Sequence, residues 1–182
     1  MLGAMFLRAR SWVGLLVACG AAVPCTDSSR SQPVELKACA APEHRQFDFW
    51  IGDWDVFERG DAGRRVARVR VSLILDDCVL LEEYDGADGH RGKSFSLYDS
   101  ATKRWRQTWV TNRGEVLDLQ GELDPGGAMV LGGFDRDPAG APRRVRGRWV
   151  AERDGAVREI AERRGAATPW TLWFDLEFRH HP

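Results

Sequence analysis

From residue 46 onward, apolar and aromatic residues alternate with charged ones in short runs, and this period of two constrains the fold more than any other feature. Val69 and Val71 fall on one face of a predicted strand. Arg68 and Arg70 fall on the other face, which we therefore expect to be solvated. No segment has a convincing helical period. The pattern predicts an all-β domain whose strands each have one buried and one exposed face.

Clusters of Gly, Asp, Asn and Pro interrupt these runs at short intervals, and each residue type favours a turn through its own backbone preference. They divide the region into about ten strands. Because the connections are short, consecutive strands should pair as a meander, and a long meander removes its exposed edges by closing. We therefore predict a single antiparallel meander that closes into a β-barrel over residues 44–182. A flat β-sandwich is the alternative.

The first residues are not expected to belong to this fold. Basic residues precede a short apolar run at residues 12–18, which is too short to span a bilayer and is typical of a secretory signal. Residues 16–19 read Leu-Val-Ala-Cys and look like a lipobox, in which Cys19 is acylated after cleavage. We predict a signal peptide with a lipobox over residues 1–19, with ordinary cleavage near residues 20–22 as the alternative. Both routes place the protein in the cell envelope or periplasm.

Residues 20–43 are rich in Pro and Ser and poor in large apolar side chains, so they are predicted to be a flexible tether. Cysteines of exported proteins tend to pair. Cys39 and Cys78 border the folded region, and we expect a disulfide between them, while Cys25 is left without an assigned partner. A bridge of this kind stabilises a fold by about 3–4 kcal/mol.

Charge and motif content exclude several classes of function. The 26 basic and 27 acidic residues nearly cancel, so we expect no nucleic-acid partner and membrane contact only through the lipid anchor. Motifs for hydrolases, metalloproteases and phosphate-binding loops are absent, so no enzymatic activity is expected. None of the four histidines has the spacing of a metal pair, and a haem would need one of them as an axial ligand. The sequence therefore predicts no cofactor.

The most specific stretch opens the folded region and reads Phe-Asp-Phe-Trp-Ile-Gly-Asp-Trp-Asp-Val at residues 47–56. Its Gly52-x-Trp54 element resembles the entry strand of lipocalins and other calycins. Together with residues 78–83, 96–110 and 170–171, it makes the chain similar, over roughly residues 39–180, to a bacterial family known only as a domain of unknown function.

The resemblance implies a calycin-like barrel, akin in shape to fatty-acid-binding proteins and nitrobindins, and brings no established substrate or catalytic residue. In calycins the tryptophan closes the base of the barrel, and a basic side chain of the last strand stacks across it. It therefore implies that Arg179 stacks on Trp54, with Trp50 and Gly52 in the same base.

The candidate ligand-binding residues are those whose strand phase turns them inward: Trp105, Gln107, Trp109, Trp149 and Glu159. An aromatic-lined interior with a few polar groups is the usual design of a small-molecule site. We expect an exported lipocalin-like protein that binds a small apolar ligand, such as a fatty acid or an isoprenoid. A filled barrel, acting as a structural or interaction protein of the envelope, is the alternative, because large aromatic residues also fill cores. A haem protein or a weak hydrolase is the more distant possibility.

Overall fold

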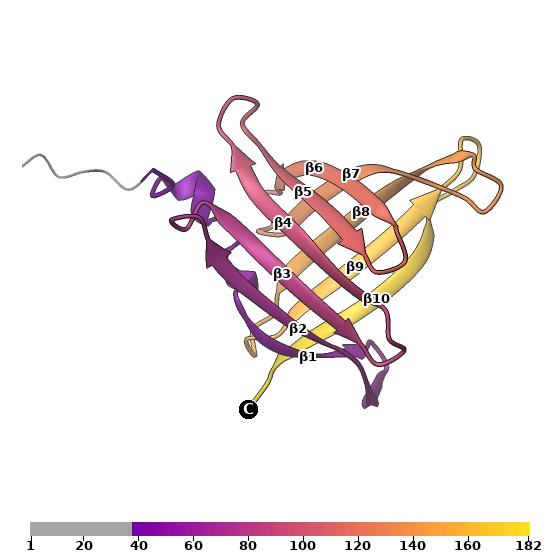
Figure 1. Ribbon diagram of the computed structural model, residues 1–182, viewed down its shortest axis with the longest axis horizontal. Coiled ribbons are helices and arrows are strands. Elements are labelled where there is room, and N and C mark those ends of the chain that lie inside the picture. Colours follow the sequence, from indigo (N-terminus) through magenta and orange to yellow (C-terminus); the bar gives the residue numbers. More distant parts are fainter. Residues whose placement is uncertain (1–37) are drawn as a thin grey trace, which may run out of the picture. The chain divides into compact units, whose positions relative to one another are not determined.

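A computed structural model describes residues 38–182, which form two short 3-10 helices and ten β-strands (Figure 1). The signal peptide, Cys19, Cys25 and the tether up to residue 37 lie outside the described residues. The elements are η1 (Pro42–Arg45), η2 (Asp48–Trp50), β1 (Gly52–Glu58), β2 (Asp61–Ile74), β3 (Val79–Gly86), β4 (Arg91–Asp99), β5 (Arg104–Thr111), β6 (Val116–Leu123), β7 (Met129–Arg136), β8 (Pro142–Ala151), β9 (Val157–Arg164) and β10 (Thr171–His180). None of the helices in the described part of the chain is long and apolar enough to cross a membrane.

The strands form a closed antiparallel barrel in which each strand pairs with the next along the chain. β10 pairs with β1 and completes the ring, with His180 opposite Trp54 and Phe178 opposite Val56. The meander predicted from the short connections is therefore confirmed, and the flat sandwich is wrong. Closure leaves no unpaired strand edge, which is the physical advantage of a barrel over an open sheet.

The period of two in the sequence separates the inside of the barrel from the outside. Gln107 on β5 and Trp149 on β8 are buried, whereas the arginines that alternate with them are exposed. Exterior arginines pair with acidic residues of neighbouring strands. Examples are Arg70 with Asp53 and Arg146 with Glu162, where the Nε atom lies 2.6 Å from a carboxylate oxygen in both pairs. The exterior is therefore a mixed, solvated surface.

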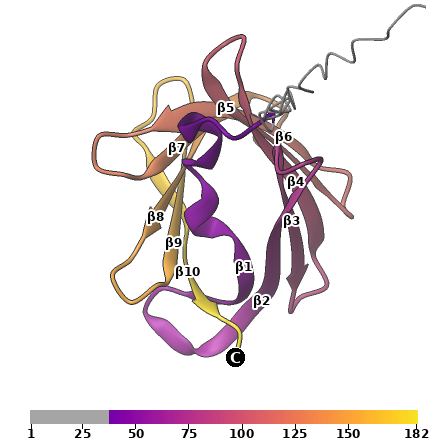
Figure 2. The ribbon, with the colours of Figure 1, turned by 90° about the vertical axis from the view of Figure 1, so that its left-hand side faces the viewer.

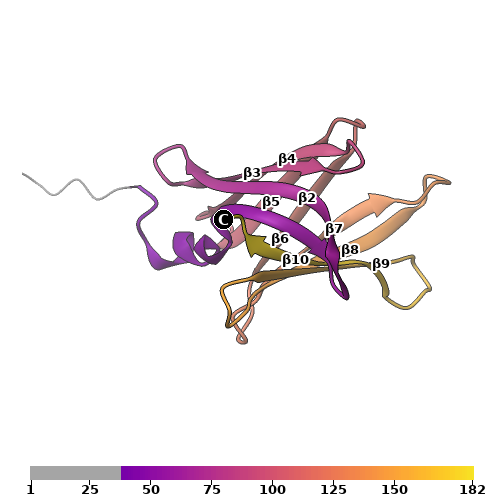
Figure 3. The same cartoon turned by 90° about the horizontal axis from the view of Figure 1, so that it is seen from below.

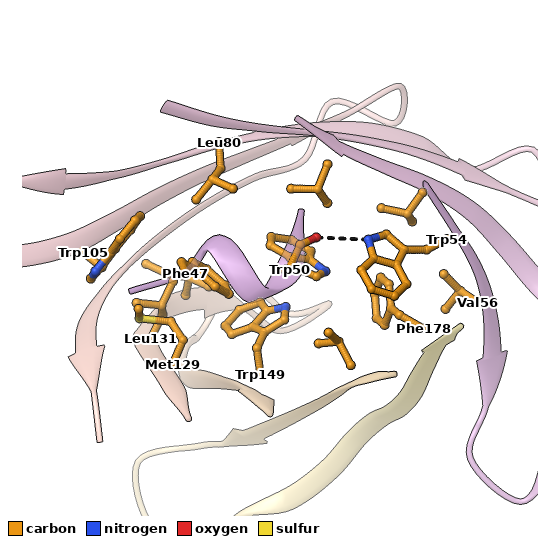
Figure 4. Packing of buried hydrophobic residues seen from close by; sticks show 14 of the residues in the cluster. Phe47, Trp50, Trp54, Val56, Leu80, Trp105, Met129, Leu131, Trp149 and Phe178 are labelled. Atoms are coloured by element: carbon orange, nitrogen blue, oxygen red, sulfur yellow. Dashed lines mark hydrogen bonds between the residues drawn. The ribbon is translucent and has the colours of Figure 1, made fainter. Parts of the chain in front are cut away.

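The chain enters the barrel through η1 and η2, at the end where β1 begins (Figure 2). Phe47 and Trp50 are completely buried there. The Phe47 ring stacks on Trp50, with a centroid distance of 5.1 Å, and meets Trp105 and Trp149 edge-on (Figure 4). This aromatic cluster fills one end of the barrel, which we call the plugged end.

A disulfide between Cys39 and Cys78 confirms the predicted pairing, with a Cα–Cα distance of 5.1 Å. Cys78 lies in the turn between β2 and β3, and the same turn receives a hydrogen bond from the Arg45 guanidinium to the Asp77 carbonyl oxygen. The bridge thus fastens the segment just before η1 to the plugged end. Residues 38–43, which the composition assigned to the tether, are part of this attachment.

The base of the barrel differs from the expectation at one contact. Trp54 donates its indole N–H to the Trp50 carbonyl oxygen at 3.0 Å, but its stacking partner is His180, with a centroid distance of 4.1 Å, and not Arg179. The register between β1 and β10 explains this contact, because His180 is opposite Trp54. Arg179 is opposite Asp55 and lies on the outer face, over the Phe57 ring. The C-terminal residues are held as well, since His181 Nδ1 lies 2.8 Å from an Asp55 carboxylate oxygen.

Removing the Cys39–Cys78 bridge should destabilise the fold by about 4 kcal/mol, because the bridge closes a long loop of the unfolded chain. The two cysteines are 39 residues apart. Denaturant unfolding of the Cys39→Ser/Cys78→Ser variant measures the loss. Cys25→Ser is the control and should leave the unfolding midpoint unchanged. An equal loss in both variants would contradict a specific role for this bridge.

Candidate functional site

The barrel is hollow at the end away from the aromatic plug. A cavity of about 1370 Å³ lies between the plugged end and the β1–β2, β3–β4, β5–β6 and β7–β8 hairpins. The β1–β2 and β7–β8 hairpins are at the end of the barrel away from η1 and η2 (Figure 3). Its wall is largely apolar and includes Trp109, Leu119, Val145, Leu176 and Phe178. Trp149 and Phe178 belong both to this wall and to the packed cluster, so the plug forms the floor of the cavity.

Four of the five predicted ligand-binding residues line this cavity: Gln107, Trp109, Trp149 and Glu159. Trp105 does not line it. Trp105 lies in the plugged end, where its indole N–H donates to Oε1 of Gln46 at 3.1 Å. Trp105 and Trp109 share the inner face of β5, but four residues of extended strand separate them by about 13 Å along the strand. The alternation along a strand shows whether a side chain points inward, but it does not show how far along the barrel that side chain lies.

Two glycines make room for the tryptophan rings of the cavity wall. A Cβ atom at Gly92 would lie 2.3 Å from Cζ2 of Trp109, and one at Gly147 would lie 2.7 Å from Cη2 of Trp149. The Trp109 ring therefore covers Gly92 on the neighbouring strand β4, and the Trp149 ring covers Gly147, which lies two residues earlier on the same strand β8. These close approaches fix the positions of both rings.

A polar network lies inside the apolar wall. Glu82 on β3 is only 7% exposed, and it accepts a hydrogen bond from Oγ of Ser94 at 2.7 Å. Nε2 of Gln107 donates to the same Oγ at 3.3 Å. The amide of Gln107 is thus linked to Glu82 through Ser94. Sequence reasoning missed Glu82 as a site residue because the inward face of its strand was ambiguous.

Glu159 on β9 is a second carboxylate of the cavity wall. It is directly opposite Trp149 on β8, and its side chain is half-buried because it borders the cavity. The indole N–H of Trp149 lies beside this carboxylate without completing a hydrogen bond. β3 and β9 are separated in the ring by β2, β1 and β10, so Glu82 and Glu159 face each other across the interior.

Burial shifts the titration of both carboxyl groups. It raises the pKa of Glu82 to about 7, against the opposing effect of the Ser94 hydrogen bond. It also raises the pKa of Glu159 well above the ordinary value, and the charge of Glu82 adds to this shift while the Trp149 N–H opposes it. Within residues 38–182, neither carboxylate forms a salt bridge with Arg, Lys or His.

Several charged groups at the mouth of the cavity form ion pairs. Asp135 lies between Arg143 and Arg163, with N–O distances of 2.7 and 2.8 Å. The Arg163 guanidinium also lies over the Trp173 ring, and burial lowers the pKa of Arg163 to about 10. Large apolar side chains at the same rim, among them Phe134 and Trp173, are exposed.

The histidines are dispersed. His90 borders the cavity near Trp109, whereas His44 lies in η1 within reach of Ser100. No group of three or more His, Cys, Asp or Glu side chains within residues 38–182 is arranged to hold a metal ion.

Comparison with known proteins gave no assignment. No model of a known protein family matches the chain, and no curated protein matches its sequence. The candidate site is therefore defined by the geometry of the cavity alone.

The stability of the protein should fall as pH rises from about 4.5 to about 7, by about 3 kcal/mol for Glu82. The folded state binds more protons in this window, because the pKa of Glu82 is about 7 in the fold and 4.5 ordinarily. Denaturant unfolding across this range should show a smaller decline for Glu82→Gln. Glu83→Gln is the control, since Glu83 lies outside and pairs with Lys93. A decline that persists undiminished in Glu82→Gln would contradict the assignment.

Gly92→Ala should displace the Trp109 ring and destabilise the fold by about 1–3 kcal/mol, because the new methyl group would overlap the indole. Gly132→Ala is the matched control, since its Cβ would meet only the Val145 carbonyl oxygen, at 3.4 Å. Thermal unfolding and the tryptophan emission spectrum report the two effects. Equal behaviour of the two variants would show that Gly92 does not fix the ring.

Proposed function

We propose that this protein binds a small apolar molecule in the hollow end of its barrel. The observation that carries the proposal is the cavity of about 1370 Å³, whose interior has aromatic and aliphatic walls with a few polar groups, while most of its charged residues lie near the mouth. Pockets that bind small molecules have this composition, and closed barrels are a common place for them. The cavity has room for a molecule of the size of a fatty acid or an isoprenoid.

The contrast between the two ends of the barrel supports this proposal. At the plugged end, Phe47, Trp50 and Trp105 fill the interior with ring-to-ring contacts. At the other end, equally large side chains such as Trp109 lie along the wall and leave the centre empty. Unfilled apolar space forfeits packing interactions, so its presence beside a well-packed core favours a binding role over a purely structural one.

The proposal places the protein outside the cytoplasm, attached through Cys19 or released by ordinary signal cleavage. The disulfide between Cys39 and Cys78 supports this location, because disulfides persist in oxidising compartments. The closed meander likewise supports membership in a calycin-like family, as the Gly52-x-Trp54 element suggests.

Native mass spectrometry of the full-length protein, purified from a bacterial envelope and followed by organic extraction, tests the proposal. We expect a bound apolar molecule at one copy per chain. A mass of protein alone, unchanged after incubation with envelope lipid extract, would refute it.

Trp109→Ala and Trp105→Ala should separate binding from stability. Trp109→Ala should abolish uptake of the extracted molecule, because this ring lines the cavity. Trp105→Ala should destabilise the protein by about 3–5 kcal/mol but retain binding, because it leaves a void in the packed end. Tryptophan fluorescence titration and denaturant unfolding measure the two properties. Undiminished uptake by Trp109→Ala would argue against the cavity as the binding site.

A further inference from the structure

The wall of the cavity carries more acidic than basic side chains. Five arginines and seven acidic residues line it. Most of the acidic residues near the mouth have a basic neighbour: Arg64 lies by Glu58, Arg113 by Asp88, His90 by Glu115, and Arg143 and Arg163 by Asp135. Glu82 and Glu159 have no such neighbour within residues 38–182. The carboxyl groups that lack a basic neighbour are therefore inside the cavity and not at its rim.

The surroundings of these two carboxylates are suited to a bound cation. Trp109, Trp149 and Tyr84 line the same cavity, and aromatic faces attract ammonium groups. The Trp149 indole is only 2% exposed, and its N–H has no hydrogen-bond partner although it lies beside Glu159. A donor is thus in place for the ionised form of Glu159, while Ser94 already donates to Glu82.

We propose that the apolar ligand carries an organic ammonium group, which binds to the Glu82 and Glu159 carboxylates while its apolar body lies against the aromatic wall. This inference rests on the proposed function and adds the chemistry of the ligand's head group. An amine supplies the N–H donors and the positive charge that two facing carboxylates lack, and charge-assisted hydrogen bonds of this kind are the stronger ones. Once this pair is ionised, as at slightly alkaline pH, it would instead repel a carboxylate head group.

Binding of decylamine and 1-decanol to the full-length protein tests this inference, because the two probes share an apolar chain and differ in the head group. We expect decylamine to bind at least about tenfold more tightly at slightly alkaline pH, as one or two charge-assisted hydrogen bonds predict. The readout is a fluorescence titration supported by calorimetry. Decanoic acid is the third probe and should bind more weakly than decanol.

The Glu82→Gln/Glu159→Gln variant should lose the preference for decylamine and keep its affinity for decanol. This variant retains the side-chain shapes and removes two ionisable carboxyl groups from an apolar wall, so it should fold, and its melting temperature verifies that. Glu83→Gln is the matched control on the outer face of β3 and should behave like the original protein.

The possible failures are distinguishable. If decanol and decanoic acid bind but decylamine has no advantage, or if its advantage survives in the double variant, the ammonium inference is overturned and the proposed function stands. If no ten-carbon probe and no envelope lipid binds, the proposed function itself fails.

Discussion

The packing of the N-terminal segment into the barrel is the interaction on which the rest of the structure depends. Phe47 and Trp50 occupy the axis of one end and bring Trp105, Trp149 and Phe178 into one aromatic cluster (Figure 4). Without them this end would be as open as the other, and the buried area that holds β1, β8 and β10 around them would be lost. The disulfide at Cys39 fixes the segment where it enters. The plug therefore gives the barrel both its core and the floor of its cavity.

Much of the fold could be predicted because it depends on patterns that are local in sequence. The alternation at Val69 and Val71 and the turn residues between runs determine strand faces and hairpins, and short connections then leave a closed meander as the natural topology. The pairing of Cys39 with Cys78 was also predictable, because only these two cysteines border the folded region. These features could be predicted because each depends on residue patterns that can be recognised without knowing the strand register.

The features that were missed depend on register and depth. Arg179 and His180 are consecutive, and only the pairing of β10 with β1 decides which of them meets Trp54. Trp105 and Trp109 have the same phase, and only the position of the plug decides which is packed and which borders empty space. Glu82 could be identified as inward only once β3 was paired with β4, where it lies opposite Ser94. Such three-dimensional relations are not encoded in a single strand.

The Glu82 and Glu159 carboxyl groups are a local inconsistency in an otherwise regular barrel. An apolar residue at Glu82 or Glu159 would fit the hydrophobic wall and would avoid the desolvation of a charged group. Departures of this kind from the rules of stable packing are expected at functional sites. Both departures occur in the cavity wall, whereas the opposite end is filled by aromatic rings that pack against one another. A ligand that compensates these charges would bind only the folded state, so loading the cavity would also stabilise the barrel that the carboxylates weaken.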